Sequence, residues 1–245
     1  MRESIDSTRL GANRTGLQMS PMHSKEMIEN VDAVAADPTE SQALAETRRE
    51  YILEADALGS IPAPATVKGM AKSGAKMLTG NRPQVFIDKL AERLAFERGG
   101  ARLYDAVLVK FMAHAAELKG VTIEDVQEIR DDEASHALLI KECIEKLGAD
   151  PTAQTPCADL VGVETMGLLQ VASDPRTTLA QTLHAALSAE LVDLDGWETL
   201  IALAENMGQD EMAELFREAL RDEGQHLAKV RSWFKALTLE TSELV

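Results

Sequence analysis

Two short stretches of the sequence carry the same group of acidic and imidazole side chains. Residues 130–136 read RDDEASH and residues 220–226 read LRDEGQH, so each contains Asp-Glu-x-x-His. Carboxylate and imidazole groups are common ligands of divalent metal ions in proteins. Glu and His three residues apart lie one helical turn apart and point to the same side of the helix. The duplicated pattern therefore predicts two matching sets of metal ligands on two helices.

Long amphipathic helices are expected to position these groups. Between Gln84 and Leu237 apolar residues recur at the three- and four-residue spacing of a buried helix face. The pattern predicts four helices, at about 84–117, 122–147, 176–206 and 209–237, with Gly120, Gly148 and Gly208 in the turns. Short turns within the first and last pairs predict two antiparallel hairpins. The long joint from Gly148 to about Arg176, with a small helix starting at Thr155 and Pro156, is expected to cross the bundle.

The two predicted hairpins repeat one design. Adding 93 to the residue numbers of the first apolar stripe gives the stripe of the third helix, and this operation relates Glu97 to Glu190. Adding 90 relates the second helix to the fourth, Glu133 to Glu223 and His136 to His226. An all-α four-helix bundle with an approximate twofold axis follows, and all six groups are expected to meet near its centre.

Buried acids need a counter-charge. An unpaired carboxylate in a protein core costs roughly several kcal/mol, and two divalent cations would balance the four carboxylates. The alternative is that each Glu-x-x-His lies on a solvated face, as we expect for the isolated acids Glu92, Glu198 and Glu205. The combined order Glu, Glu-x-x-His, Glu, Glu-x-x-His on duplicated apolar stripes favours the metal site.

This order of residues resembles the ferritin-like di-iron carboxylate superfamily, and its ligand pattern is most similar to that of rubrerythrin-like proteins without the rubredoxin domain. The resemblance covers about residues 84–237. It implies a dinuclear site of two iron ions, with manganese or a mixed manganese–iron pair using similar ligands. The implied ligands are Glu97, Glu133, His136, Glu190, Glu223 and His226. Within this set Glu133 and Glu223 would bridge the two metals, and each His would bind one metal.

The resemblance also implies residues around the ligands. Asp132 and Asp222 would accept hydrogen bonds from the far nitrogens of the ligand imidazoles. Tyr104 lies two turns after Glu97, and Trp197 takes the equivalent place in the second half. Asp193, one turn after Glu190, is either an extra metal ligand or a solvated acid beside the helix seam. The first half has Gly100 at that place.

Composition limits the other functions of the chain. The protein has 245 residues, is 45% hydrophobic and only 4% aromatic, and carries a formal net charge of −16. Such a charge disfavours nucleic acid and anionic membranes as partners. Cys143 and Cys157 form no C-x-x-C, so neither a rubredoxin-type site nor a disulfide framework is expected. No signal peptide and no membrane-spanning run is recognised, and a cytoplasmic protein is expected.

The remaining segments match no part of the family. Residues 1–36 are interpreted as an arm, followed by a helix that begins at Asp37 and Pro38 and ends near Gly59, so residues 1–83 form a mostly helical extension. Residues 238–245 are interpreted as a tail. Residues 68–82 carry four basic residues and no acid. They predict a short basic helix that is a solvated face packed on the bundle or on a neighbouring subunit, or, alternatively, a contact for a membrane surface or an acidic partner.

The expected function is redox chemistry at the dinuclear site. An oxygen-rich pair of irons can react with hydrogen peroxide or O₂, which would make the protein a peroxidase or a ferroxidase-like oxidoreductase. An external electron donor and a homo-oligomer are expected partners. Two alternatives stay open: metal binding without turnover, for iron handling or as a structural clip, and an interaction protein that the metal only stiffens. Oxidation of an organic substrate would require a pocket beside the metals.

Overall fold

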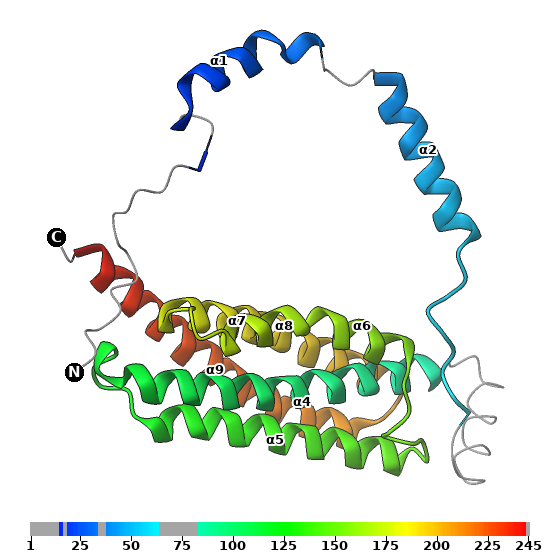
Figure 1. Cartoon of the computed structure of the whole chain (residues 1–245). Coiled ribbons are helices and arrows are strands. Elements are labelled where there is room, and N and C mark those ends of the chain that lie inside the picture. Colours follow the sequence, from blue (N-terminus) through cyan, green and yellow to red (C-terminus); the bar gives the residue numbers. More distant parts are fainter. Residues whose placement is uncertain (1–14, 17–18, 34–37, 64–82, 244–245) are drawn as a thin grey trace. The chain divides into compact units, whose positions relative to one another are not determined.

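The computed structural model describes residues 15–16, 19–33, 38–63 and 83–243. The chain divides into two compact units, residues 1–58 and 59–245, and each is described by itself. The larger unit is an all-α four-helix bundle with a helical crossover (Figure 1). Its helices are α4 (Pro83–His114), α5 (Ile123–Lys146), α6 (Pro156–Glu164), α7 (Met166–Ser173), α8 (Leu179–Asn206) and α9 (Asp210–Glu243). A 3₁₀ turn, η3 (Ala115–Glu117), ends α4.

Two hairpins form the bundle, as the repeat predicts. Helix α4 packs along α5 and α8 packs along α9, while α4 also contacts α8 and α5 contacts α9. The crossover helices pack on the bundle. Helix α6 lies against α4, and α7 lies against both α4 and α8. Figure 1 shows α6 and α7 along this one face. The predicted single crossover between the hairpins is therefore confirmed, and it covers the α4–α8 side.

Local sequence signals fix where these helices begin and end. The side chains of Thr122 and Thr178 each accept a hydrogen bond from the backbone N–H of the third residue of the following helix. The side chains of those residues, Asp125 and Gln181, accept a hydrogen bond from the backbone N–H of Thr122 and Thr178, which makes two capping boxes. Thr155 caps α6, and Pro156 occupies its first turn as predicted. The turn glycines at 120, 148 and 208 all have positive φ, a conformation that side chains other than glycine rarely adopt.

The apolar core is divided into two clusters along the bundle axis. One cluster includes Phe86 and Phe216, and the other includes Phe111 and Trp233. On α5, α8 and α9 the residues that interrupt the apolar stripes lie between these clusters in sequence. The polar centre of the bundle is therefore enclosed by hydrophobic packing at both ends, which excludes water from it.

Several predicted boundaries differ from the structure. The arm contains a short helix, α1 (Pro21–Glu29), and a 3₁₀ turn, η2 (Val31–Ala33), which agrees with a mostly helical extension. Helix α2 (Pro38–Glu54) ends before Gly59, because no apolar contact extends it. Helix α7 was not predicted, and α9 continues to Glu243, six residues into the expected tail. The basic segment 68–82 and Asp37 lie outside the described residues.

Among the described residues, no helix is both long and apolar enough to cross a membrane.

Candidate metal centre

Six acidic and imidazole side chains meet in the core of the bundle. Helices α4 and α8 each supply one Glu, and α5 and α9 each supply a Glu and a His one turn apart. None of the six residues is more than 6% exposed: Glu97, Glu133, His136, Glu190, Glu223 and His226. The structure thus brings together every ligand that the repeat predicted, between the two apolar clusters.

The six residues form two overlapping groups that could each hold an ion. In each group one ligand atom per residue lies within 4.8 Å of the others. The first group consists of Glu97, His136 and Glu223. The second consists of Glu133, Glu190, Glu223 and His226. Glu223 belongs to both, which is the geometry that a bridging carboxylate needs.

Glu133 also takes part in two groups. Besides its place in the second group, its carboxylate lies within the same limit of Glu97 and Asp193. The bridging roles of Glu133 and Glu223 stay predictions.

The two imidazoles are oriented by acids from the opposite hairpin. His226 Nε2 lies 3.0 Å from the Asp132 carboxylate, and His136 Nε2 lies 3.7 Å from the Asp222 carboxylate. A carboxylate accepts but does not donate, so Nε2 of His226 carries the proton and donates to Asp132. The Nδ1 atoms of His136 and His226 then face Glu223, at 2.7 Å and 3.2 Å. This arrangement leaves Nδ1 available for a metal ion, because the two Asp residues hold the imidazoles by their far nitrogens.

Many polar atoms of the centre have no hydrogen-bond partner. Buried polar atoms in folded proteins are almost always satisfied, so each exception needs a cause. At this centre the unpartnered atoms are both carboxylate oxygens of Glu97 and one oxygen each of Glu133 and Glu190. Nδ1 of His136 and the remaining oxygen of Glu223 have only each other, 2.7 Å apart. All of them are oxygen or nitrogen atoms that bind hard or borderline divalent cations. The donor set therefore fits a pair of such ions.

Protons and one arginine supply positive charge where no ion is bound. Burial and the surrounding carboxylates raise the pKa of Glu133 well above its ordinary value, and burial with the charge of Glu223 raises the pKa of Glu190 to about 8. Burial opposes the charged forms of the two histidines, yet the nearby carboxylates raise the pKa of His136 to about 11 and that of His226 to about 9. Burial alone would raise the pKa of Glu223, but hydrogen bonds with both histidines lower it to about 2.

Asp193 is buried and forms an ion pair that the sequence did not predict. It is 2% exposed, so the alternative of a solvated acid beside the seam is wrong. The guanidinium of Arg93, which is 3% exposed, donates to its carboxylate, and Nη1 of Arg93 also lies 3.5 Å from Glu97. Gly196 makes room for this arginine, because a Cβ there would lie 1.4 Å from Arg93 Nη2. The signal that could have identified Arg93 is its place one turn before Glu97 on the buried face.

Gly100 gives Glu133 its position. A Cβ built on Gly100 would lie 1.9 Å from Glu133 Oε2. The residue at the equivalent place in the second half is Asp193, so the two halves of the repeat differ here for a physical reason: one half accommodates a carboxylate from α5, and the other supplies its own.

The two aromatic residues around the centre have unequal roles. The Tyr104 hydroxyl donates a hydrogen bond to Glu190 across the bundle, and burial together with this carboxylate raises the pKa of Tyr104 well above its ordinary value. Trp197 packs its ring against the edge of His136, with the ring centroids 5.4 Å apart. Tyr104 thus holds a ligand of the other hairpin, whereas Trp197 restricts an imidazole by packing.

The three isolated acids expected on a solvated face lie outside the site, and so do two further histidines. His114 pairs with Glu117, and His184 is exposed beside the ring of Phe234. Glu198 is exposed, Glu205 pairs with Arg217, and Glu92 is partly exposed and pairs with Lys89.

Comparisons with known proteins agree with this architecture and leave the activity open. The sequence model of one family, described as "Domain of unknown function (DUF892)", matches residues 81–243, and this family is part of the ferritin-like superfamily. No curated protein and no solved structure matches the chain.

Gly100→Ala is expected to weaken metal binding roughly 10–100-fold, because the new Cβ takes the place of the Glu133 carboxylate. The matched control is Gly99→Ala, whose Cβ would meet Thr165 at an ordinary distance of 3.6 Å. Isothermal titration calorimetry with Mn²⁺ measures both affinities. Equal affinities in the two variants would show that the position of Glu133 does not matter for binding.

Metal uptake at pH 7 is expected to release about three protons, because metal ions displace protons from their ligands. The pKa values of about 11, 9 and 8 for His136, His226 and Glu190 keep these three ligands protonated at pH 7. The apparent affinity therefore falls as pH is lowered. Calorimetry in buffers with different ionisation enthalpies counts the protons, and a binding heat that is independent of the buffer would contradict this charge assignment.

Proposed function

We propose that this chain, which belongs to the DUF892 family, is a di-iron carboxylate redox protein that reacts with hydrogen peroxide or O₂ in the core of its bundle. One observation carries the proposal: four carboxylates and two imidazoles converge in a dry core, with unpartnered atoms facing one another and with Glu223 common to two ligand groups. The rubrerythrin-like character of the site belongs to the same proposal, as do manganese or a mixed pair as alternatives to iron.

When bound, a pair of ferrous ions supplies two electrons. With the uptake of two protons, two electrons reduce one hydrogen peroxide to two molecules of water. The protein supplies geometry and charge. Glu133 and Glu223 hold the two positions together, and Asp132 and Asp222 keep the imidazole rings in one orientation. Tyr104 holds Glu190 by a hydrogen bond and places an O–H group in the centre.

The Arg93–Asp193 pair supports a peroxide reaction in particular. Asp193 lies in one possible ligand group with Glu97 and Glu133, while Arg93 neutralises its charge. If Asp193 left Arg93 as the positive charge of the centre increased, its carboxylate would stabilise the oxidised state more than the reduced state. Such differential binding lowers the barrier of the reaction.

Two other functions make different demands on the same residues. Iron handling without turnover requires binding but no fast reaction with an oxidant. An interaction protein requires the bundle only as a stable support for its N-terminal extension. The cluster of unpartnered ligand atoms favours the redox function over the second alternative, since a support alone is more stable with an apolar core. A cytoplasmic location, an external electron donor and a homo-oligomer remain predictions.

The wild-type protein is expected to bind two iron ions per chain, and Glu223→Gln is expected to lose both, because one carboxylate serves both positions. His136→Gln should weaken one position more than the other. Metal analysis after anaerobic loading with Fe²⁺ measures this, with Glu198→Gln as the control because Glu198 is exposed on α8. A Glu223→Gln protein that keeps two ions would refute the bridging role.

The diferrous protein is expected to react faster with hydrogen peroxide than with O₂ in stopped-flow mixing. Asp193→Asn should slow the peroxide reaction at least about tenfold, since removing one group that stabilises developing charge costs this much or more. Asp195→Asn is the matched control, as Asp195 is exposed on the same helix. An O₂ rate at or above the peroxide rate would replace this proposal with a ferroxidase or oxygenase, and an unchanged peroxide rate in Asp193→Asn would remove Asp193 from the reaction.

A further inference from the structure

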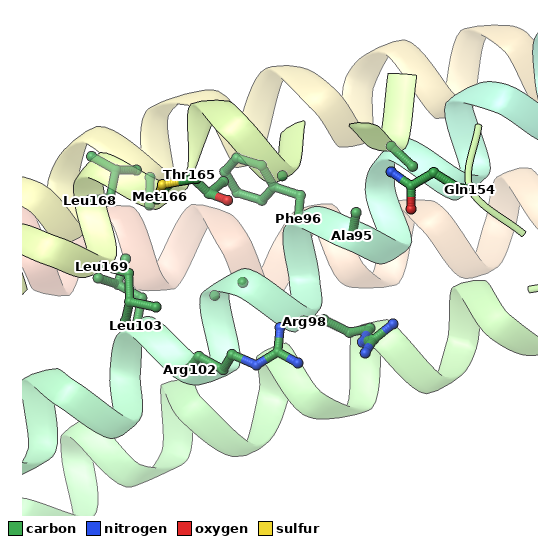
Figure 2. A pocket seen from close by; sticks show the side chains of 15 residues that line it. Ala95, Phe96, Arg98, Arg102, Leu103, Gln154, Thr165, Met166, Leu168 and Leu169 are labelled. Carbon is green, nitrogen blue, oxygen red and sulfur yellow. The ribbon is translucent and has the colours of Figure 1, made fainter. Parts of the chain in front are cut away.

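A cavity lies on the crossover side of the bundle, between α4 and the helices α6 and α7. Its volume is about 350 Å³, within the range of small-molecule pockets in proteins. Figure 2 shows Leu103, Leu168 and Leu169 at one end, Gln154 at the other, and Arg98 and Arg102 along the lower edge. The cavity is thus an apolar space with a polar rim.

The cavity borders the metal centre. Its wall includes Phe96, Gly100 and Ala189. Phe96 and Ala189 directly precede the candidate ligands Glu97 and Glu190, and Gly100 is the residue against which the Glu133 carboxylate lies. At Gly100 no side chain stands between the two spaces, so a molecule in the cavity lies beside the centre.

The rim carries two cations without an acid. Arg98 and Arg102 lie one turn apart on α4, both are exposed, and neither forms an ion pair with any residue in the described parts of the chain. In a protein with a net charge of −16, these two arginines form a local positively charged rim. Guanidinium groups bind carboxylates through paired hydrogen bonds. The rim therefore favours an anionic group at this place and disfavours a cationic one.

We propose that this cavity binds a small organic acid, with its carboxylate at Arg98 and Arg102 and its apolar body against Leu103, Leu168 and Leu169. The volume and the apolar walls select a hydrocarbon body, and the arginines select the charge at its end. The inference deepens the proposed function by naming the class of molecule held beside the centre, but binding itself requires no redox reaction.

The direct test is calorimetric titration of the full-length protein with octanoate, compared with octanol, octylamine and acetate. Octanoate is expected to bind at least about tenfold more tightly than each of the other three, because only octanoate has both the apolar body and the negative charge. The double variant Arg98→Gln, Arg102→Gln should lose about tenfold in octanoate affinity, whereas Arg231→Gln, an exposed arginine on α9, should lose nothing. Equal binding of octanoate and octanol would overturn the role of the arginines.

A second variant tests the place of binding, because Arg98 and Arg102 also border a groove against α5. Gly162 on α6 lines this cavity and not the groove, and a Cβ there would meet no heavy atom within 4 Å, so the leucine of Gly162→Leu is expected to narrow the cavity. Gly167→Leu on α7 is the control, since Gly167 also has open space and does not line the cavity. Octanoate binding should be lost in the first variant and kept in the second.

Octanoate affinity that survives Gly162→Leu would overturn the proposal. The proposed redox function fails on a different result. If the protein binds octanoate but never oxidises iron, the organic-acid site stands and only the redox function is contradicted.

Discussion

Four carboxylates enclosed in one dry core are the constraint on which the rest of the structure depends. Their mutual repulsion is strong at low dielectric, so positive charge has to be present whether or not metal is bound. Without metal, protons on Glu190 and both histidines supply it, and Arg93 neutralises Asp193. Two divalent ions would displace those protons from the ligand residues and supply the positive charge instead. The same site can thus be a stable folded core and a binding site with high affinity.

The duplicated hairpin gives the centre its symmetry, and a few residues break that symmetry. Asp132 and Asp222 reach across to the histidines of the opposite hairpin, as a twofold axis requires. At the next level the halves differ: Arg93 corresponds to Ala186, Gly196 to Leu103, and Gly100 to Asp193. These differences place a buried ion pair on one side of the centre only. The two ligand groups around Glu97 and Glu190 are therefore chemically unequal.

Much of the fold and the ligand set could be predicted from sequence because both depend on local periodicity. The apolar stripes set the helices, and the acids that interrupt them identify the centre. Arg93, Gly196 and the cavity could not be predicted, since each depends on contacts between residues far apart in the chain: Arg93 and Asp193 are 100 residues apart, and the cavity requires the crossover helices to lie against α4. The ends of α2 and α9 were mispredicted because little tertiary packing marks them. The ligand roles themselves stay predictions.

Diffraction from crystals of the iron-loaded protein, collected on both sides of the iron absorption edge, tests the central claim most directly. The account predicts two anomalous peaks in the bundle core, one beside His136 and one beside His226, with the Glu223 carboxylate between them. A core without anomalous density in protein that carries iron elsewhere, or a single peak that Glu223 does not touch, would contradict it.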